Sequence, residues 1–280
     1  MLQRWGHDNS LARRDGDQMV MGPTHAMSGA TAGLVMATLL PPEWGGPTSI
    51  AGTFVFVSVT AGAALLPDLD SPQATIARSF GPASQVLARV TENTAQLLHT
   101  ATRSPKDARR HNGHRTATHT LLFAVLTGLA TGAATTAFGK SAAIAILFVT
   151  LGLALRGLFP NWSKKNDWFL VTGLAAVLAY ATWTQLPESA SPVALGAAVT
   201  VGVLTHLLGD MITKRGVPLF APLPIGGRRW YDVRLPSLLR ITASGPADRL
   251  LLAACTAAVL VLSYLTVFDP AALGIAWAGR

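Results

Sequence analysis

The chain carries its candidate chemical groups as histidines and aspartates in four short stretches of sequence. These residues are His25, Asp68, Asp70, His114, His119, His206 and Asp210. Imidazole and carboxylate ligands together favour Zn²⁺ or a similar transition metal, and Mn²⁺ is also compatible with them. The seven residues are therefore candidate ligands for one or two divalent ions.

The spacing within two of these stretches supports a shared cation. His206 and Asp210 stand four residues apart in THLLGD, so a helix presents both on one face. Asp68 and Asp70 stand two apart in LLPDLD, where an extended backbone after Pro67 would aim them to opposite sides. One of them can bind the ion while the other bridges, or orients a histidine from behind. An aspartate that is not a ligand would serve as general base.

The remaining cysteine and histidines add little to this set. The single Cys255 excludes a disulfide framework and a CxxC metal site. With several carboxylates and no thiolates, a catalytic site with an open position is favoured over a closed structural one. His7, His99 and His111 are expected to be exposed loop residues.

The elements that position these groups are expected to be membrane-spanning helices. Of 280 residues, 50% are hydrophobic and only 13% charged, so the apolar surface exceeds what one globular core can bury. Seven apolar segments approach the length of a span, at about residues 25–40, 49–66, 119–138, 141–159, 168–186, 191–209 and 249–268. The predicted fold is an all-α, polytopic transmembrane bundle of about seven spans.

The positions of Lys and Arg predict the orientation of this bundle. With the N-terminus in the cytoplasm, nearly all of them fall in the cytoplasmic segments 1–24, 67–118, 160–167 and 210–248, whereas outside connections hold Lys140 and the chain ends with Arg280. This asymmetry accounts for the formal charge of +8 without nucleic acid, which is not expected as a partner. The polar first 23 residues contain no cleavable signal peptide.

The same reasoning divides the chain into a membrane-embedded domain and two tails. Residues 1–23 are predicted to be a polar cytoplasmic tail, residues 24–268 the membrane domain, and residues 269–280 a C-terminal tail. Two cytoplasmic insertions interrupt the domain. Residues 71–117 have apolar residues at partly helical spacing, which predicts a basic amphipathic helix on the inner membrane surface. Residues 211–248 are rich in Pro and Gly, which predicts an ordered loop.

On this topology, all seven candidate ligands fall at the cytoplasmic ends of their helices. The orientation was derived from Lys and Arg alone, so the coincidence is an independent argument for a functional cluster. Together the stretches THAMSGATAG (24–33), LLPDLDSP (65–72), HRTATH (114–119) and HLLGDMITKRGVPLFAPL (206–223) resemble the YdjM-like family of membrane-bound, metal-dependent hydrolases. The resemblance covers most of the chain.

The resemblance implies an inner-membrane hydrolase that uses the seven His and Asp residues as metal ligands and is distantly similar to zinc-dependent phospholipase C. The chain departs from the family pattern in two places. Thr116 and Ala117 stand where the family often has a glycine, and Asp248 stands where it tends to have a glutamate. Asp248 is therefore a further candidate ligand.

The resulting functional hypothesis is hydrolysis of a phosphoester or other ester in a membrane lipid or lipid-linked substrate at the cytoplasmic leaflet. Asp68 or Asp70 would act as base, and Arg115, Lys214 or Arg215 would stabilise an oxyanion. Two alternatives are a divalent-cation transporter and a non-catalytic membrane scaffold. The transporter is disfavoured because the midplane stretches 55–62 and 175–182 hold no ionisable residue. The many small residues in the helices would permit a homo-oligomer.

Overall fold

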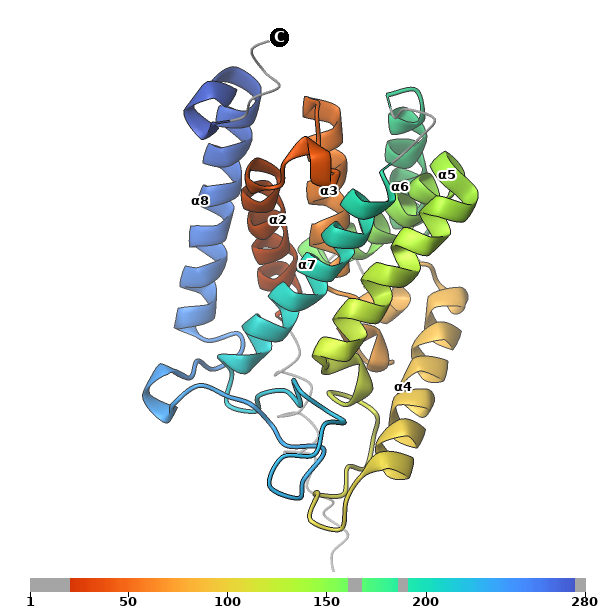
Figure 1. The fold of residues 1–280 in the computed structure, drawn as a ribbon, viewed down its shortest axis with the longest axis vertical. Coiled ribbons are helices and arrows are strands. Elements are labelled where there is room, and N and C mark those ends of the chain that lie inside the picture. Colours follow the sequence, from red (N-terminus) through yellow and green to blue (C-terminus); the bar gives the residue numbers. More distant parts are fainter. Residues whose placement is uncertain (1–20, 161–167, 186–190, 275–280) are drawn as a thin grey trace, which may run out of the picture.

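A computed structural model describes residues 21–160, 168–185 and 191–274 of the protein. In this part of the chain, seven α-helices, labelled α2 to α8, are joined by loops and short 3₁₀ helices, and β-structure is limited to isolated bridges. The α-helices form a bundle (Figure 1). The prediction of an all-α helix bundle is therefore confirmed. Most of the predicted N-terminal tail lies outside the described residues.

The first two helices pack closely because small residues face one another. Helix α2 spans Gly22–Leu39 and helix α3 spans Ile50–Ala63. A Cβ atom on Gly29 would lie 2.7 Å from the side chain of Ala64, so only glycine allows this approach. Small residues permit such contacts between helices in lipid, where no hydrophobic driving force brings helices together.

Helix α5 spans Leu121–Leu158 and is broken at Gly139. Gly139 has φ 56° and ψ −135°, a conformation that glycine adopts readily and other residues rarely reach. The break separates two arms, which correspond to the predicted apolar segments 119–138 and 141–159.

Both ends of α5 lie at the same end of the bundle, so its two arms run in opposite directions. His119, just before α5, has its Nε2 atom 3.8 Å from the Asp68 carboxylate. A Cβ atom on Gly157, in the last turn, would lie 2.5 Å from the side chain of Leu65. Both contacts are therefore made with the short segment that follows α3.

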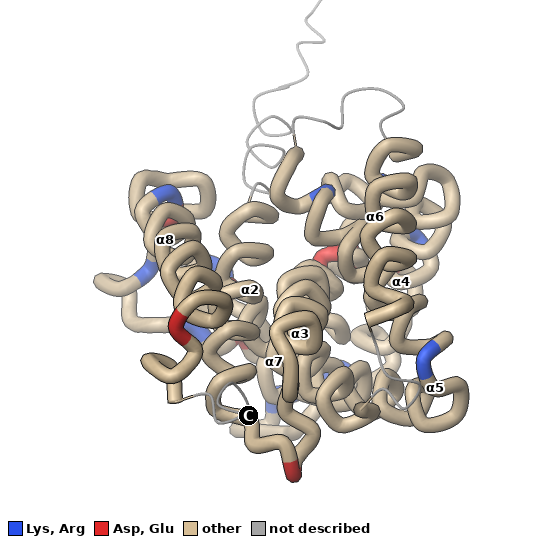
Figure 2. Tube along the Cα trace, turned by 90° about the horizontal axis from the view of Figure 1, so that it is seen from above, with Lys and Arg blue, Asp and Glu red and all other residues tan. Residues whose placement is uncertain are grey.

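The remaining apolar helices pack against α2, α3 and α5. Helix α6 (Trp168–Trp183) packs on α5, helix α7 (Pro192–Met211) contacts α2, α3 and α5, and helix α8 (Pro246–Phe268) packs on α2. Figure 2 looks down on the bundle, with α3 and α7 near the middle and α8 beside α2. Large apolar side chains of α6 and α8 remain exposed, as expected for helices that face lipid. They include Phe169, Leu170, Val177, Tyr180, Leu250, Leu260, Val261, Tyr264 and Phe268.

Among the described residues, four helical stretches are long and apolar enough to cross a membrane. They are Ile50–Asp70, Leu121–Leu158, Pro192–Met211 and Pro246–Phe268, and Trp168–Trp183 is a shorter apolar helix. Each of the seven predicted apolar segments coincides with a helix or, for α5, with one arm of a helix. The number of spans and the cytoplasmic location of the N-terminus remain predictions.

The predicted amphipathic helix is shorter than residues 71–117. Helix α4 spans Pro82–Thr102 and leaves an apolar face exposed. That face is formed by Val86, Leu87, Val90, Leu97 and Leu98. Ile76 lies instead in a buried 3₁₀ helix, Thr75–Arg78, and a Cβ atom on Gly152 of α5 would lie 2.2 Å from the Phe80 ring. These two apolar residues pack inward rather than extending the amphipathic helix.

Residues 212–245, called here the cap, form an ordered loop over the same end of the bundle, as the sequence predicts. The cap is fixed to the loop after α4 by the Asp107 carboxylate, which accepts hydrogen bonds from the N–H groups of Ser104, Arg229 and Trp230. The indole N–H of Trp230 also donates to the Thr102 hydroxyl at 3.0 Å. The cap therefore has a defined position relative to α4 and the helix ends beneath it.

Candidate metal centre

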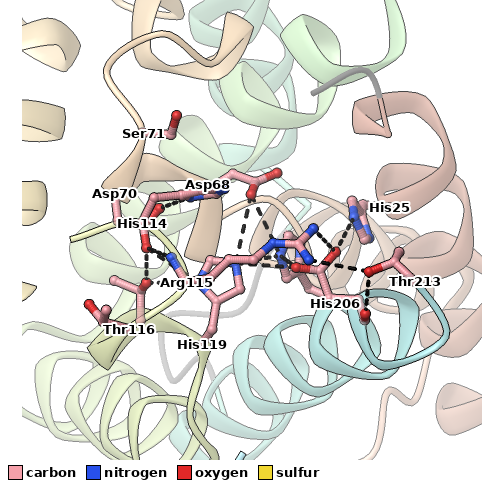
Figure 3. Close-up of polar contacts among 12 residues, drawn as sticks. His25, Asp68, Asp70, Ser71, His114, Arg115, Thr116, His119, His206 and Thr213 are labelled. Carbon is pink, nitrogen blue, oxygen red and sulfur yellow. Dashed lines mark hydrogen bonds and ion pairs between the residues drawn. The ribbon is translucent and has the colours of Figure 1, made fainter. Parts of the chain in front are cut away.

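The seven candidate ligands come from four elements that end or begin at the capped end of the bundle. His25 lies in the first turn of α2, and His206 and Asp210 lie in the last two turns of α7. Asp68 and Asp70 lie in a 3₁₀ helix, Pro67–Asp70, so the extended backbone expected after the proline is wrong. His119 ends a second 3₁₀ helix, Ala117–His119, and His114 lies shortly before it. Figure 3 labels six of these side chains, all but Asp210, and shows them converging.

Four ligand atoms face one another at the centre of this group. The Nε2 atoms of His119 and His206 are 3.2 Å apart. Asp68 Oδ1 lies 3.8 and 3.7 Å from these two nitrogens, and Asp210 Oδ2 lies 3.4 and 3.7 Å from them. Ligand bonds of about 2.0–2.1 Å to a tetrahedral Zn²⁺ would place neighbouring ligand atoms about 3.3 Å apart. These five distances, 3.2–3.8 Å, are therefore close to the spacing of atoms that share one metal ion.

Two features of the surroundings fit a cation at this point. Asp210 is only 1% exposed, yet its Oδ2 atom accepts no hydrogen bond from the described residues. A buried carboxylate oxygen without a partner is costly, and a metal ion would satisfy it. His206 is fully buried and its Nδ1 lies 2.8 Å from the Ala64 carbonyl oxygen, so Nδ1 carries the hydrogen and Nε2 keeps its lone pair.

Asp70 contacts the Nδ1 atoms of His114 and His119, and it is not one of the four residues whose ligand atoms face one another. One carboxylate oxygen lies 2.8 Å from His114 Nδ1, and the other accepts hydrogen bonds from the Arg115 N–H at 3.0 Å and from the Thr118 hydroxyl. The second oxygen also lies 3.3 Å from His119 Nδ1. A carboxylate on the remote nitrogen of a metal-binding histidine fixes the ring and raises its basicity.

The electrostatics around His119 follow from these carboxylates. Burial lowers the pKa of His119, but the negative charges of Asp70 and Asp210 outweigh burial and raise the pKa to about 9. The metal-free ring is then protonated at neutral pH. A metal ion must displace that proton, so binding is coupled to proton release.

His25 and His114 extend the group on two sides. The His25 ring stacks on His206 with centroids 4.1 Å apart, and its Nε2 lies 3.6 Å from Asp210 Oδ1. His114 meets His119 edge to face at 5.5 Å. Two groups of three residues have ligand atoms within 4.8 Å of one another: His25, His206 and Asp210, and Asp68, His114 and His119. The described residues thus contain buried His and Asp groups that could hold a metal ion.

Arg115, which the sequence predicts to stabilise a substrate oxyanion, is engaged by Asp210 and Thr213. Its Nη2 donates to Asp210 Oδ1 at 2.8 Å, and Nη1 donates to the Thr213 hydroxyl at 3.2 Å. Its backbone is left-handed, with φ 56°, which is strained for a residue with a side chain. The backbone and the side chain of Arg115 are therefore both used in building the centre.

The centre opens into a cavity of about 460 Å³. His25, Asp68, His114, Arg115 and Asp210 line it on the metal side. Its other walls include polar or basic residues, namely Gln73, Asn112, Lys214 and Arg215. Lys214 and Arg215 are exposed, so their positive charges stand at the rim. Of the four central ligand residues, Asp68 and Asp210 line this cavity.

Three further polar residues belong to neither group that could hold a metal. Asp248 is buried, but its carboxylate accepts the Ser244 N–H at 3.0 Å at the start of α8, and it belongs to neither group that could hold a metal. His99 is 1% exposed and lies edge-on to Trp230, so the prediction of an exposed loop residue is wrong for it. His111 is exposed, as expected, and His7 lies outside the described residues.

The sequence interpretation missed two threonines that hydrogen-bond to residues of the centre. Thr118 donates to Asp70 and Thr213 accepts from Arg115. Thr118 precedes His119 directly and Thr213 follows Asp210 by three residues, so their closeness to candidate ligands was a usable signal. Threonine is common in every apolar segment of this chain, however, and residue type alone did not separate these two.

Comparison with known proteins gives one match. Residues 19–159 and 168–273 match the family model described as YdjM inner membrane protein. No curated protein and no solved structure matches the chain. The two matched ranges include every one of the seven candidate ligands.

Proposed function

Because the chain belongs to the YdjM inner membrane protein family and gathers His and Asp ligand atoms beside a cavity, we propose that it is a membrane-bound, metal-dependent hydrolase. The observation that carries the proposal is the convergence of ligand atoms from His119, His206, Asp68 and Asp210, with distances of 3.2–3.8 Å. One of these atoms, Asp210 Oδ2, is buried and accepts no hydrogen bond from the described residues. Zn²⁺ is the favoured ion and Mn²⁺ the second choice. The distant similarity to zinc-dependent phospholipase C stays a prediction.

The substrate is proposed to be a phosphoester, or less favourably another ester, in an amphiphilic molecule such as a membrane lipid or lipid-linked phosphate. Two observations support this. The ligand atoms lie at the ends of apolar helices, at the level where headgroups would meet the protein, and Lys214 and Arg215 place positive charge at the cavity rim. Such charges attract an anionic headgroup and stabilise developing negative charge.

A divalent ion held by these residues with one position left open to water would act as a Lewis acid and make that water acidic enough to supply a nucleophile near neutral pH. The chain itself must then accept a proton. Asp70 is fully buried and both of its oxygens are already engaged, so it is a poor acceptor. His114 lines the cavity, is partly exposed and is held at Nδ1 by Asp70, which leaves Nε2 as the proton acceptor.

The alternative of a divalent-cation transporter would use the same residues transiently. Its pathway should carry ionisable groups along the length of the bundle. Among the described parts of α3, α6 and α7, ionisable residues other than tyrosine occur only at the metal end of α7. This arrangement favours chemistry at one membrane face over passage through the bundle.

The test is a phosphodiesterase assay on the purified full-length protein in detergent, with a chromogenic phosphodiester and with a phospholipid as substrates. Chelator and the His206→Ala variant should each abolish metal-dependent turnover, and re-addition of Zn²⁺ or Mn²⁺ should restore it only in the wild type. His111→Ala is the matched control, because this histidine is exposed and belongs to neither group of candidate ligands, and it should keep full activity. Metal-loaded protein that hydrolyses no ester but moves cations into liposomes would instead establish the transporter.

A further inference from the structure

The guanidinium group of Arg115 adjoins the proposed metal position through Asp210. The two oxygens of Asp210 point to different partners. Oδ2 faces His119 and His206, whereas Oδ1 accepts a hydrogen bond from Arg115 at 2.8 Å and lies 3.6 Å from His25 Nε2. A carboxylate that presents one oxygen to each of two positively charged neighbours is the usual bridge in two-metal sites.

The atoms around the Arg115 guanidinium are those that would bind a cation. Besides Asp210 Oδ1, they are the Thr213 hydroxyl oxygen at 3.2 Å and the Gly216 carbonyl oxygen at 3.5 Å. With His25 next to Asp210, these oxygens form a set of one nitrogen and three oxygen ligands. Without the guanidinium, such a set would suit a divalent ion with a preference for oxygen.

The position of the Arg115 side chain is built into the fold. Its N–H is hydrogen-bonded to Asp70 and its backbone adopts the left-handed conformation. Arginine also keeps its charge at every physiological pH, so the positive group cannot leave by deprotonation. A divalent ion in the position that this permanent charge occupies would be repelled by it.

From these contacts we propose that the centre holds a single divalent ion, and that Arg115 fills the position of a second one. The inference rests on the proposed metal-dependent function and specifies the metal number for that site. Arg115 then neutralises Asp210 on one side while the metal ion neutralises it on the other. The fixed guanidinium also leaves one ion to be loaded and lost, so metal content should change in a single step.

The test counts ions on the full-length protein in detergent. Protein stripped by chelator is titrated with Mn²⁺, and bound metal is measured by elemental analysis and by electron paramagnetic resonance, which distinguishes an isolated Mn²⁺ from a coupled pair. The wild type should bind one ion and give the spectrum of an isolated Mn²⁺. Arg115→Ala should bind a second, weaker ion and give the coupled spectrum, and Arg115→Lys, which keeps the charge, should bind one.

A double variant locates the second ion. In Arg115→Ala combined with His25→Ala the second ion should be lost and the count should return to one. Two ions in the wild type would overturn the inference, as would a single ion in folded Arg115→Ala at saturating Mn²⁺. No bound ion in the wild type would refute the proposed function itself. If Arg115→Ala fails to fold, the wild-type count and spectrum still decide the metal number.

Discussion

At the scale of single residues, the ligands are oriented by groups that do not themselves face the metal position. The Ala64 carbonyl sets the tautomer of His206, and Asp70 holds both His114 and His119. Because the remote nitrogens of His206 and His119 are engaged, the other nitrogen of each ring has a defined direction. Such partners commonly matter for metal affinity almost as much as the ligands do.

Replacing Asp70 by asparagine tests this orienting role. Asp70→Asn keeps the shape of the side chain but removes the charge that holds His119 and His114, so metal affinity should fall by about 10- to 100-fold. Competition with a chromophoric chelator measures the change. Asp248→Asn is the control, because Asp248 is also buried but its carboxylate accepts the Ser244 N–H and belongs to neither metal group, and it should leave metal affinity unchanged. Equal affinities for wild type and Asp70→Asn would contradict the role given to Asp70.

At the scale of elements, the cap is joined to α4 through a buried histidine. His99 is almost fully buried beside Trp230, and neither ring nitrogen has a hydrogen-bond partner among the described residues. Burial, and then the nearby charges of Arg110 and Arg103, lower the pKa of His99. The folded protein therefore favours the neutral ring.

This shift gives the attachment of the cap a definite pH dependence. A histidine with a lowered pKa in the folded state contributes stability above its unfolded pKa of about 6.5, and this contribution is lost as pH falls below that value. The melting temperature of the wild type should therefore fall more between about pH 7.5 and about pH 5.5 than that of His99→Leu. His111→Leu, at an exposed position, should behave as the wild type does. Identical pH profiles for wild type and His99→Leu would exclude this role.

The reversal of α5 makes a second prediction about an element. Gly139 has a positive φ that is costly for any other residue, so Gly139→Ala should destabilise the protein by about 1–3 kcal/mol. Gly173→Ala is the matched control in α6, where an added Cβ meets no atom within 4 Å, and it should be neutral or slightly stabilising. Unfolding in a denaturing detergent gives both values. Equal stabilities for the two variants would mean that α5 does not depend on this turn.

At the scale of the whole molecule, the polar chemistry lies at one end of an apolar bundle. The metal-facing residues, Lys214 and Arg215 lie at the capped end, whereas Lys140, directly after the break in α5, lies over the Trp183 ring at the end of α6. The excess of Lys and Arg at the capped end predicts that this end faces the cytoplasm. The proposed hydrolase would then act on the inner leaflet.

Cysteine labelling tests this orientation. In a Cys255→Ser background, a single cysteine is placed at Glu43, between α2 and α3, or at Lys214, on the cavity rim, both of which are exposed. A membrane-impermeant maleimide added to cells with a permeabilised outer envelope but an intact inner membrane should label Glu43→Cys and not Lys214→Cys. After disruption of the inner membrane, both should be labelled. The reverse pattern would place the metal centre on the outer face.

The sequence by itself determined the apolar segments, the break near residue 139, and the accumulation of His and Asp at one end. These features are local, because hydropathy depends on consecutive residues and the positions of helix ends follow from it. The tertiary structure decided which atoms meet. It placed Asp68 rather than Asp70 among the inner four, paired Arg115 with Asp210, and buried His99 beneath Trp230. Those outcomes depend on how helices distant in sequence are rotated and packed against one another, and no local pattern of residues specifies that rotation.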